Sequence, residues 1–438
     1  MRFLLLVLLL VALRPVPAAA ALITVDTLSD AKLSSNGDCT LREAIQAAND
    51  DVAVDACTAG DGADTILIEL TGTIVITSTL RLTSAIEIIG PGALLLAVDA
   101  DANGRVFTVI PEDNDITIRG LTITGGFEIN GGGVFVSTTG EGQVTITDTR
   151  IVSNSVTGRG GGVYVAGGVL AAPPPVVFER VFIQGNVANG FGAAGGGMAF
   201  LASSGVLRSS TVSGNLAFVD GGGIDFAGES LLIDRSTISG NTATTGEGGG
   251  LQVIDGTVDL RHTTVTGNIA DSSPGIDVGN GDLQIFNTVT AGNTTTSGTA
   301  DHTDFAKTGS IGALTTLGHN YVGVQDPDAL FSAITAFGAG TPNAEGDYVG
   351  TDAAPLDPAL GSLVNNGGPT LTHLPNPSAP FPLVEIGSCP GVLYDQRGLA
   401  GSFAGRVVDG PPANADDGCD IGAVEFNADF EQPVEPDV

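Results

Sequence analysis

The sequence predicts an all-β protein whose chain winds into a parallel β-helix, a solenoid of stacked coils. An asparagine returns at intervals of 25 to 32 residues, and an aliphatic residue stands three positions before most copies. Glycine runs follow these asparagines, and glycine accounts for 64 of the 438 residues. The segments between them alternate β-branched and polar residues without a helical period. Repeats of this length indicate stacked units, and strand-only units shorter than the ~40–45 residues of a propeller blade fit a solenoid.

The repeat predicts two columns of equivalent residues, because adjacent coils stack about 4.8 Å apart. The aliphatic residues would form an interior stack whose burial supplies most of the stability. The asparagines suit turns, where the side-chain amide can bond to its copy in the next coil. A β-sandwich with coincidental glycine turns is the alternative. The aliphatic residues are Ile151, Ile183, Val212, Ile238 and Val265, and the asparagines are Asn154, Asn186, Asn215, Asn241, Asn268 and Asn293.

Composition excludes several classes of protein. The formal net charge is −33, so the overall field should repel nucleic acid and anionic lipid, and we expect no nucleic-acid partner. Charged residues make up only 15% of the chain, which argues against a coiled coil or helical bundle. Hydrophobic residues make up 42%, which argues against disorder.

Residues 1–20 have the pattern of an export signal. Arg2 precedes the apolar run Phe3–Leu13, which is too short to span a bilayer, and small residues end the segment at Ala18–Ala20. An uncleaved membrane anchor is the alternative. No later segment reaches eighteen consecutive apolar residues. We therefore expect export through the Sec pathway, a secreted or cell-surface location, and no transmembrane span in the mature chain. We also expect the mature protein to be a monomer.

A solenoid exposes an unpaired edge at each end, so both ends need lids. Residues 21–64 contain the first: Thr40 and Glu43 form a capping-box pattern, followed by a short helix with one apolar face that ends at Asn49-Asp50. Residues 65–300 then hold roughly nine coils. Residues 301–427 form the C-terminal lid, and residues 428–438 an acidic tail.

Four cysteines fit an oxidising compartment. They allow three disulfide pairings, and locality favours Cys39 with Cys57 and Cys389 with Cys419. No pair has Cys-x-x-Cys spacing and the four histidines are scattered, so we do not expect zinc.

Two end motifs resemble a known family. The segment CTLREAIQAAN at Cys39–Asn49 is similar to the CSLREA motif of exported bacterial β-helix proteins, with Thr40 in place of serine. The C-terminal segments LGHNYVG, DPALGSLVNNGGPTLTH, DQRG and CDIGAVEF resemble the choice-of-anchor Q domain. The Gly-Gly-Gly-Ile and (Ile/Val)-x-x-Asn repeats are similar to those of polymorphic outer-membrane proteins, which are surface adhesins. The resemblance implies a right-handed parallel β-helix on or outside a bacterial cell, and it implies no reaction.

The best candidate for a ligand-binding face is the residue two positions after each glycine run. By strand alternation these side chains point away from the interior. Asp225 and Asp277 would lie two coils apart, roughly 9.6 Å, close to the ~6.5–9.5 Å between the carboxyl groups of inverting glycosidases. A solvated sheet face is the alternative. The column is Phe135, Tyr164, Ala199, Asp225, Gln252 and Asp277, of which Tyr164, Asp225, Gln252 and Asp277 are the candidate ligand contacts.

The segment Asp99-x-Asp101-x-Asn103-Gly104 imitates the first half of a calcium loop. An EF-hand needs glutamate eleven residues after Asp99, and Ile110 stands there. A tight turn between two coils explains the same residues. We expect no cofactor and no metal site, with weak calcium ligation by Asp99, Asp101 and Asn103 as the alternative.

These observations favour an interaction protein over an enzyme. We expect adhesion, or binding of an extracellular glycan or surface protein, with no catalytic residues. The alternative is a polysaccharide lyase or glycoside hydrolase on the same scaffold, which the absence of tryptophan and of a His/Asp cluster in the sequence disfavours.

Overall fold

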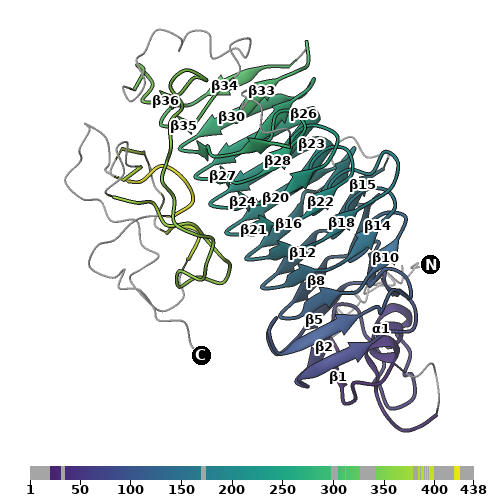
Figure 1. Ribbon diagram of the computed structural model, residues 1–438. Helices are drawn as coiled ribbons and strands as arrows, with labels where there is room; N and C mark the ends of the chain where they lie inside the picture. Colours follow the sequence, from purple (N-terminus) through teal and green to yellow (C-terminus); the bar gives the residue numbers. More distant parts are fainter. Residues whose placement is uncertain are drawn as a thin grey trace, which may run out of the picture.

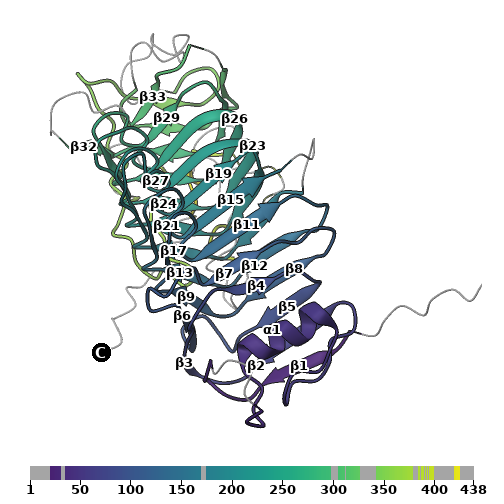
Figure 2. The same cartoon turned by 90° about the vertical axis from the view of Figure 1, so that its right-hand side faces the viewer.

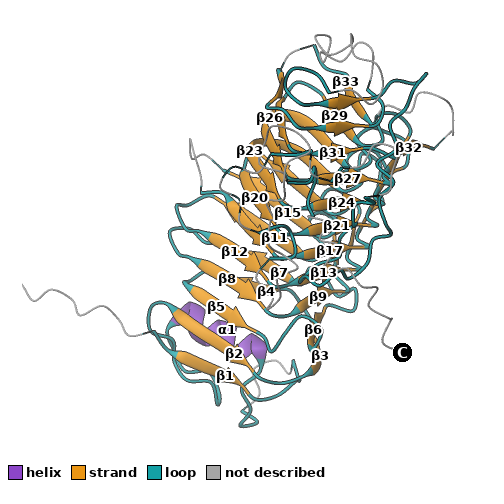
Figure 3. Ribbon diagram, turned by 90° about the vertical axis from the view of Figure 1, so that its left-hand side faces the viewer, coloured by secondary structure: helices purple, strands orange, loops and turns teal. Residues whose placement is uncertain are grey.

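The chain forms a rod of stacked parallel coils (Figure 1). The computed structural model describes residues 20–30, 35–168, 174–296, 304–310, 312–325 and 342–377, and short pieces between 383 and 424. The predicted export signal, apart from residue 20, and the acidic tail at 428–438 lie outside the described residues. Within the described part, α1 (Leu41–Asp50) is the only helix, and all pairings between named strands are parallel (Figure 3).

The first side of the rod is an 18-stranded sheet, here called sheet 1. Its strands run in two stacks, which the eleven-residue strands β23 and β26 join because each pairs with strands of both. The strands are β1 (Leu22–Val25), β2 (Asp64–Ile68), β4 (Leu80–Leu82), β5 (Ile86–Ile89), β7 (Phe107–Val109), β8 (Ile116–Arg119), β11 (Val134–Thr138), β12 (Val144–Thr147), β15 (Val163–Gly167), β16 (Val176–Glu179), β19 (Met198–Leu201), β20 (Ser204–Arg208), β23 (Ile224–Asp234), β26 (Leu251–Arg261), β29 (Ile276–Val278), β30 (Asp282–Phe286), β33 (Phe305–Lys307) and β34 (Leu314–Thr316).

Two further sheets close the coil. Sheet 2 has 11 strands and sheet 3 has 7. Sheet 2 consists of β3 (Gly72–Val75), β6 (Leu96–Asp99), β9 (Thr122–Thr124), β13 (Arg150–Val152), β17 (Phe182–Gln184), β21 (Thr211–Ser213), β24 (Thr237–Ser239), β27 (Thr264–Thr266), β31 (Val289–Thr290), β35 (Tyr321–Val322) and β36 (Tyr348–Val349). Sheet 3 consists of β10 (Phe127–Glu128), β14 (Ser155–Val156), β18 (Val187–Ala188), β22 (Leu216–Ala217), β25 (Thr242–Ala243), β28 (Ile269–Ala270) and β32 (Thr294–Thr295).

The predicted aliphatic column is confirmed. Ile151 pairs with Ile183 in the next coil, and the register continues unbroken through β21, β24 and β27. All five members are fully buried in one core that runs the length of the rod. Stacking equivalent residues at the inter-strand spacing therefore makes a continuous apolar interior out of short strands.

The predicted asparagine ladder is also confirmed. In Asn215, for example, both the backbone N–H and the side-chain Nδ2 donate to Oδ1 of Asn241, at 3.0 and 2.9 Å. The same pair of bonds joins each successive asparagine from Asn154 to Asn293. The last one, Asn293, donates instead to the carboxylate of Asp304, at 2.7 and 2.8 Å.

The N-terminal lid forms as predicted. Thr40 and Glu43 complete the capping box, in which Glu43 N donates to Thr40 Oγ1 and Thr40 N donates to the Glu43 carboxylate. The helix buries Leu41, Ala44, Ile45 and Ala48 and packs against β1, β2 and β4 at the end of the rod (Figure 2). Cys39 and Cys57 form the predicted disulfide. Cys419 is also disulfide-bonded, and Cys389 lies outside the described residues.

The C-terminal region has two parts. Strands β33 to β36 add to the stack after residue 300. The stack of parallel strands therefore extends into the segment that was expected to be a lid. The later described pieces then run back along the flank of sheet 2 (Figure 1). There they bond to a column of buried threonines: Thr211 Oγ1 donates to Leu371 O, Thr237 Oγ1 donates to Gln396 Oε1, and Ala423 N donates to Thr264 Oγ1.

Candidate functional site

The predicted outward column exists as one row of sheet 1. Phe135 pairs with Tyr164, Tyr164 with Ala199, and the register continues through Asp225 and Gln252 to Asp277. Asp225 and Asp277 therefore lie two coils apart in the same row, as the spacing predicted. The rings of Phe135 and Tyr164 are tilted by 31° with centroids 5.8 Å apart, and the guanidinium of Arg105 lies 4.9 Å from the Phe135 centroid.

The row does not form an open groove. Asp225 and Asp277 have 0% exposure, Gln252 6% and Tyr164 7%, so the candidate contacts are covered although they point away from the coil interior. The cover comes from the glycine runs. A Cβ added at Gly195, Gly221 or Gly248 would lie 2.8 Å from an atom of the row residue of its own coil. The glycines therefore let the loop lie directly on the row, a role that goes beyond turning the chain through positive φ.

The pKa values of the buried and half-buried acidic side chains at this row are raised. Burial raises the pKa of Asp225 to about 7, against the opposing effect of Arg159, whose Nη1 lies 2.8 Å from Asp225 Oδ2. Burial, together with the charges of Asp277 and Asp220, raises the pKa of Glu247 to about 7. Burial also raises the pKa of Asp277. Such groups suit proton transfer, but the fully buried Asp225 and Asp277 lack the access that a polysaccharide would need.

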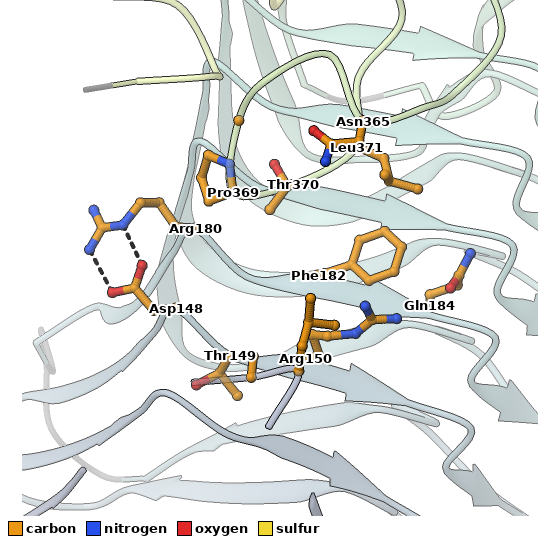
Figure 4. A pocket seen from close by; sticks show the side chains of 13 residues that line it. Asp148, Thr149, Arg150, Arg180, Phe182, Gln184, Asn365, Pro369, Thr370 and Leu371 are labelled. Atoms are coloured by element: carbon orange, nitrogen blue, oxygen red, sulfur yellow. Dashed lines mark hydrogen bonds and ion pairs between the residues drawn. The ribbon is translucent and has the colours of Figure 1, made fainter. Parts of the chain in front are cut away.

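A second candidate site lies on sheet 2, facing residues 365–371; its aromatic side chain, Phe182, is itself only 6% exposed. A cavity of about 430 Å³ separates the outward face of β13 and β17 from residues 365–371 (Figure 4). On the sheet side, Arg150 stacks on Phe182 with its guanidinium 4.9 Å from the ring centroid, and Gln184 lies at the edge. Asn365, Pro369, Thr370 and Leu371 face them from the flank segment.

A bidentate ion pair between Arg180 and Asp148 borders this cavity. Arg180 Nε and Nη2 donate to the two carboxylate oxygens of Asp148 at 2.7 and 2.9 Å. Burial acts to raise the pKa of Asp148, but the bonds and charge of Arg180 outweigh it and hold the pKa below its ordinary value. Asp148 is therefore ionised at neutral pH. It can accept hydrogen bonds from a ligand but does not hold the proton that a general acid donates.

Sequence reasoning missed this cavity. Arg150 and Phe182 stand directly before Ile151 and Ile183, so the repeat places them in one outward column. The repeat could therefore have predicted the wall of the cavity on sheet 2. It could not have predicted the opposite wall, because residues 365–371 lie about two hundred positions further along the chain and belong to no repeat.

A second cavity, of about 580 Å³, lies on sheet 1 beside β20, β23 and β26. Arg208, Arg261 and His262 are among its lining residues. His262 Nδ1 lies 3.4 Å from Asp234 Oδ1, and the buried Nε2 has no hydrogen-bond partner among the described residues. The sequence suggested no His/Asp pair because these residues are 28 positions apart; the coil period brings them together.

The calcium candidates form a turn. The carboxylate of Asp99 accepts the backbone N–H of Asp101, and Asn103 N donates to Ala100 O. Asp101 has positive φ, at 44°. Among the described residues, no group of three His, Cys, Asp or Glu side chains is arranged to hold a metal ion.

One comparison with known proteins, a family model, agrees with the architecture. A family model described as the right handed beta helix region matches residues 108–295. The fold is therefore a right-handed parallel β-helix, as predicted. No curated protein matches the sequence. Among solved structures, the crystal structure of pectate lyase Pel9A is similar over 93% of this chain and 96% of its own, with 14% identity and a TM-score of 0.45. In the part of the chain that is described, no helix has the length and apolar character needed to cross a membrane.

Proposed function

We propose that this protein is an exported β-helix that binds an extracellular glycan without catalysis, and that the cavity between sheet 2 and residues 365–371 is its binding site. The observation that carries the proposal is a cavity of about 430 Å³ whose lining combines fixed polar groups with the largely buried ring of Phe182. Sugar rings present apolar faces and hydroxyl edges. An aromatic side chain packs against the former, and oriented carboxylate, amide and guanidinium groups bind the latter.

Two features favour binding over catalysis at this cavity. Asp148, its lining carboxylate, is paired with Arg180 and has a lowered pKa, so it serves as an acceptor. Arg150 is held on Phe182, which presents its N–H groups in a fixed orientation. Rigid groups of this kind lower the entropy cost of recognition.

The export part of the proposal rests on residues 1–20 and on the resemblance of Cys39–Asn49 to the CSLREA motif. The disulfide between Cys39 and Cys57 supports an oxidising compartment. Expression in a bacterial host followed by N-terminal sequencing of the extracellular protein would test it. A mature chain starting near residue 21 is expected, and retention of Met1 in the cytoplasm would contradict it.

Glycan binding is tested on an array, followed by titration of the best ligand. Phe182→Ala and Gln184→Ala are each expected to weaken binding about tenfold, which is ~1.4 kcal/mol. The matched control is Phe191→Ala, because Phe191 is fully exposed away from the cavity. Equal loss in the control, or normal binding in both cavity variants with an unchanged fold, would contradict the proposed site.

A lyase is the second candidate, and the cavity on sheet 1 is the observation that favours it. The imidazole of His262 faces Asp234 through Nδ1 and lies near Arg208 and Arg261, and proton abstraction beside a carboxylate sugar would require its buried Nε2 to be uncovered. Incubation with acidic polysaccharides, read out by ultraviolet absorbance of unsaturated products, separates the two candidates. Product formation that His262→Ala abolishes would select the enzyme, and binding without product would select adhesion.

A further inference from the structure

The cavity between sheet 2 and residues 365–371 has a local charge opposite to that of the whole protein. Among its lining residues, the charged ones are Arg150, Arg180 and Asp148, so one positive charge is in excess. The full chain has 49 acidic and 16 basic residues. A positively charged cavity on a strongly acidic protein attracts anions where the overall field repels them.

The two arginines of this cavity differ in how they are neutralised. Arg180 forms ion pairs with both Asp148 and Glu179. The guanidinium of Arg150 has no ion pair and no hydrogen bond among the described residues, and it lies over the ring of Phe182, 4.9 Å from the centroid. Arg150 is also half-buried, so part of its side chain remains accessible to solvent. The excess charge of the cavity is therefore located on Arg150.

The stack on Phe182 determines how this charge is presented. Arg150 and Phe182 are register partners in adjacent coils, which lie about 4.8 Å apart. Because the guanidinium contacts the ring through its face, the N–H groups at its edge stay free to donate. A planar fork of N–H groups matches the two oxygens of a carboxylate, with which it forms two parallel hydrogen bonds.

Two neutral side chains of the cavity also have unused hydrogen-bonding groups. Asn365 Oδ1 accepts the backbone N–H of Gly367 at 3.0 Å, whereas Nδ2 has no partner among the described residues. The half-buried carboxamide of Gln184 makes no hydrogen bond within the described part of the chain. Gln184 stands one coil and two residues from Arg150, steps of about 4.8 Å and roughly 6.6 Å. Figure 4 shows these side chains around the same cavity as Arg150.

We propose that the glycan bound in this cavity carries a carboxylate, as uronic acids do, and that Arg150 binds this carboxylate through its free N–H groups. Asn365 Nδ2 and the carboxamide of Gln184 bind the neighbouring hydroxyl groups, since a carboxamide both donates and accepts. The inference rests on the proposed glycan site and narrows its ligand to acidic sugars. A neutral sugar would leave the guanidinium of Arg150 without an ionised acceptor.

The first test changes the ligand and leaves the protein natural. Isothermal titration calorimetry of the full-length protein compares oligogalacturonate and oligomannuronate with their methyl esters, which keep the sugar rings and remove the charge. At least one acid is expected to bind about thirtyfold more tightly than its ester. Added sodium chloride should weaken binding of the acid more than binding of the ester. No preference for either acid over its ester would overturn the proposal.

The second test changes Arg150. Arg150→Gln should remove the preference for the acid while binding of the ester persists. Arg150→Lys keeps the charge but lacks the planar fork, so it should restore only part of the preference. Arg81→Gln is the matched control, because Arg81 is an exposed residue of β4 on sheet 1 and its loss changes the net charge equally. A full preference in Arg150→Gln, or an equal loss in Arg81→Gln, would contradict the assignment.

Two further outcomes separate this inference from the proposed function. Poly-glutamate carries carboxylates without sugar rings, and binding as tight as that of the acidic oligosaccharides would overturn the assignment to a glycan. Neutral glycans that bind as tightly as acidic ones, and lose affinity in Gln184→Ala, would overturn this inference and leave the glycan site standing. Absence of binding to any glycan would overturn both.

Discussion

The early coils, residues 64–124, and the later coils, residues 126–296, share sheets 1 and 2 but differ at one corner. In the early coils the chain passes from sheet 2 back to sheet 1 without forming a strand of sheet 3. In the later coils every passage forms such a strand, beginning at β10. The asparagine ladder begins at the same point, where Gly126 N donates to Asn154 Oδ1.

The difference shows what the asparagine contributes. At the bend between sheets 2 and 3 the side chain bonds to both neighbouring coils: Asn241 Nδ2 donates to Val212 O and to Asn268 Oδ1. Because hydrogen bonds to the coils on both sides fix the backbone at this bend, a strand of sheet 3 can begin directly after it. The early coils rely on the apolar core and on the helical lid. The third sheet and the buried polar ladder thus occur in the same coils, and four changes test that contrast.

The largest effect is expected from Asn241→Ala in the ladder. Truncation removes the acceptor of the Asn215 N–H, one of the two acceptors of Asn215 Nδ2, and the Asn241 donor to Val212 O. The loss of three buried hydrogen bonds should lower the free energy of unfolding by about 4 kcal/mol, measured by urea denaturation. Val98→Ala is the comparison. Val98 pairs with Ile123, which pairs with Ile151, so it continues the aliphatic column into an early coil, and its truncation should cost about 2 kcal/mol. A smaller loss for Asn241→Ala than for Val98→Ala would show that the ladder does not hold the corner.

Removal of the disulfide should act on the early end alone. The double variant Cys39→Ser, Cys57→Ser opens a loop of 18 residues, with an expected loss of about 3 kcal/mol on the chain-entropy account. Amide hydrogen exchange shows which part of the rod loses stability. Faster exchange is expected in α1, β1 and β2, with later coils unchanged. Uniform acceleration along the rod would mean that the two regions unfold as one unit.

The far end of the ladder should respond to pH. Burial raises the pKa of Asp304 to about 7, against the bonds from Asn293 and Val324, while an unfolded aspartate titrates near ~4. Between these values the folded state holds more protons than the unfolded state. Stability is therefore highest below the lower value, falls as the pH rises towards 7, and then levels off.

Asp304→Asn should make this slope shallower, as followed by thermal unfolding from pH 4 to pH 8. Asp225 and Glu247, whose pKa values burial also raises to about 7, keep part of the slope. A slope unchanged by Asp304→Asn would show that this carboxyl does not titrate differently in the folded protein.

The smallest effect concerns the lid. Thr40→Ala removes the hydroxyl that accepts Glu43 N, and loss of one helix cap costs about 1 kcal/mol. Thr40→Ser restores the hydroxyl and should recover most of the stability. Equal stability of the alanine and serine variants would mean that the packed helix face, rather than the cap, holds the lid.

Much of the molecule could be predicted from the sequence because a solenoid turns sequence period into spatial contact. Residues one period apart, such as Ile183 and Val212, become direct neighbours. The row from Phe135 to Asp277 followed from the same rule. Its burial did not, because alternation says which way a side chain points but not whether a loop covers it.

The sequence by itself thus determined the coils, the apolar column, the asparagine ladder and the capped helix, since each depends on contacts between residues close in the chain or one period apart. The tertiary structure alone decided that glycine loops close over Asp225 and Asp277, that Asp304 ends the ladder, and that residues 365–371 wall a cavity against Phe182. The physical reason is that these contacts join segments with no common period. Their partners are set by the packing of the whole rod.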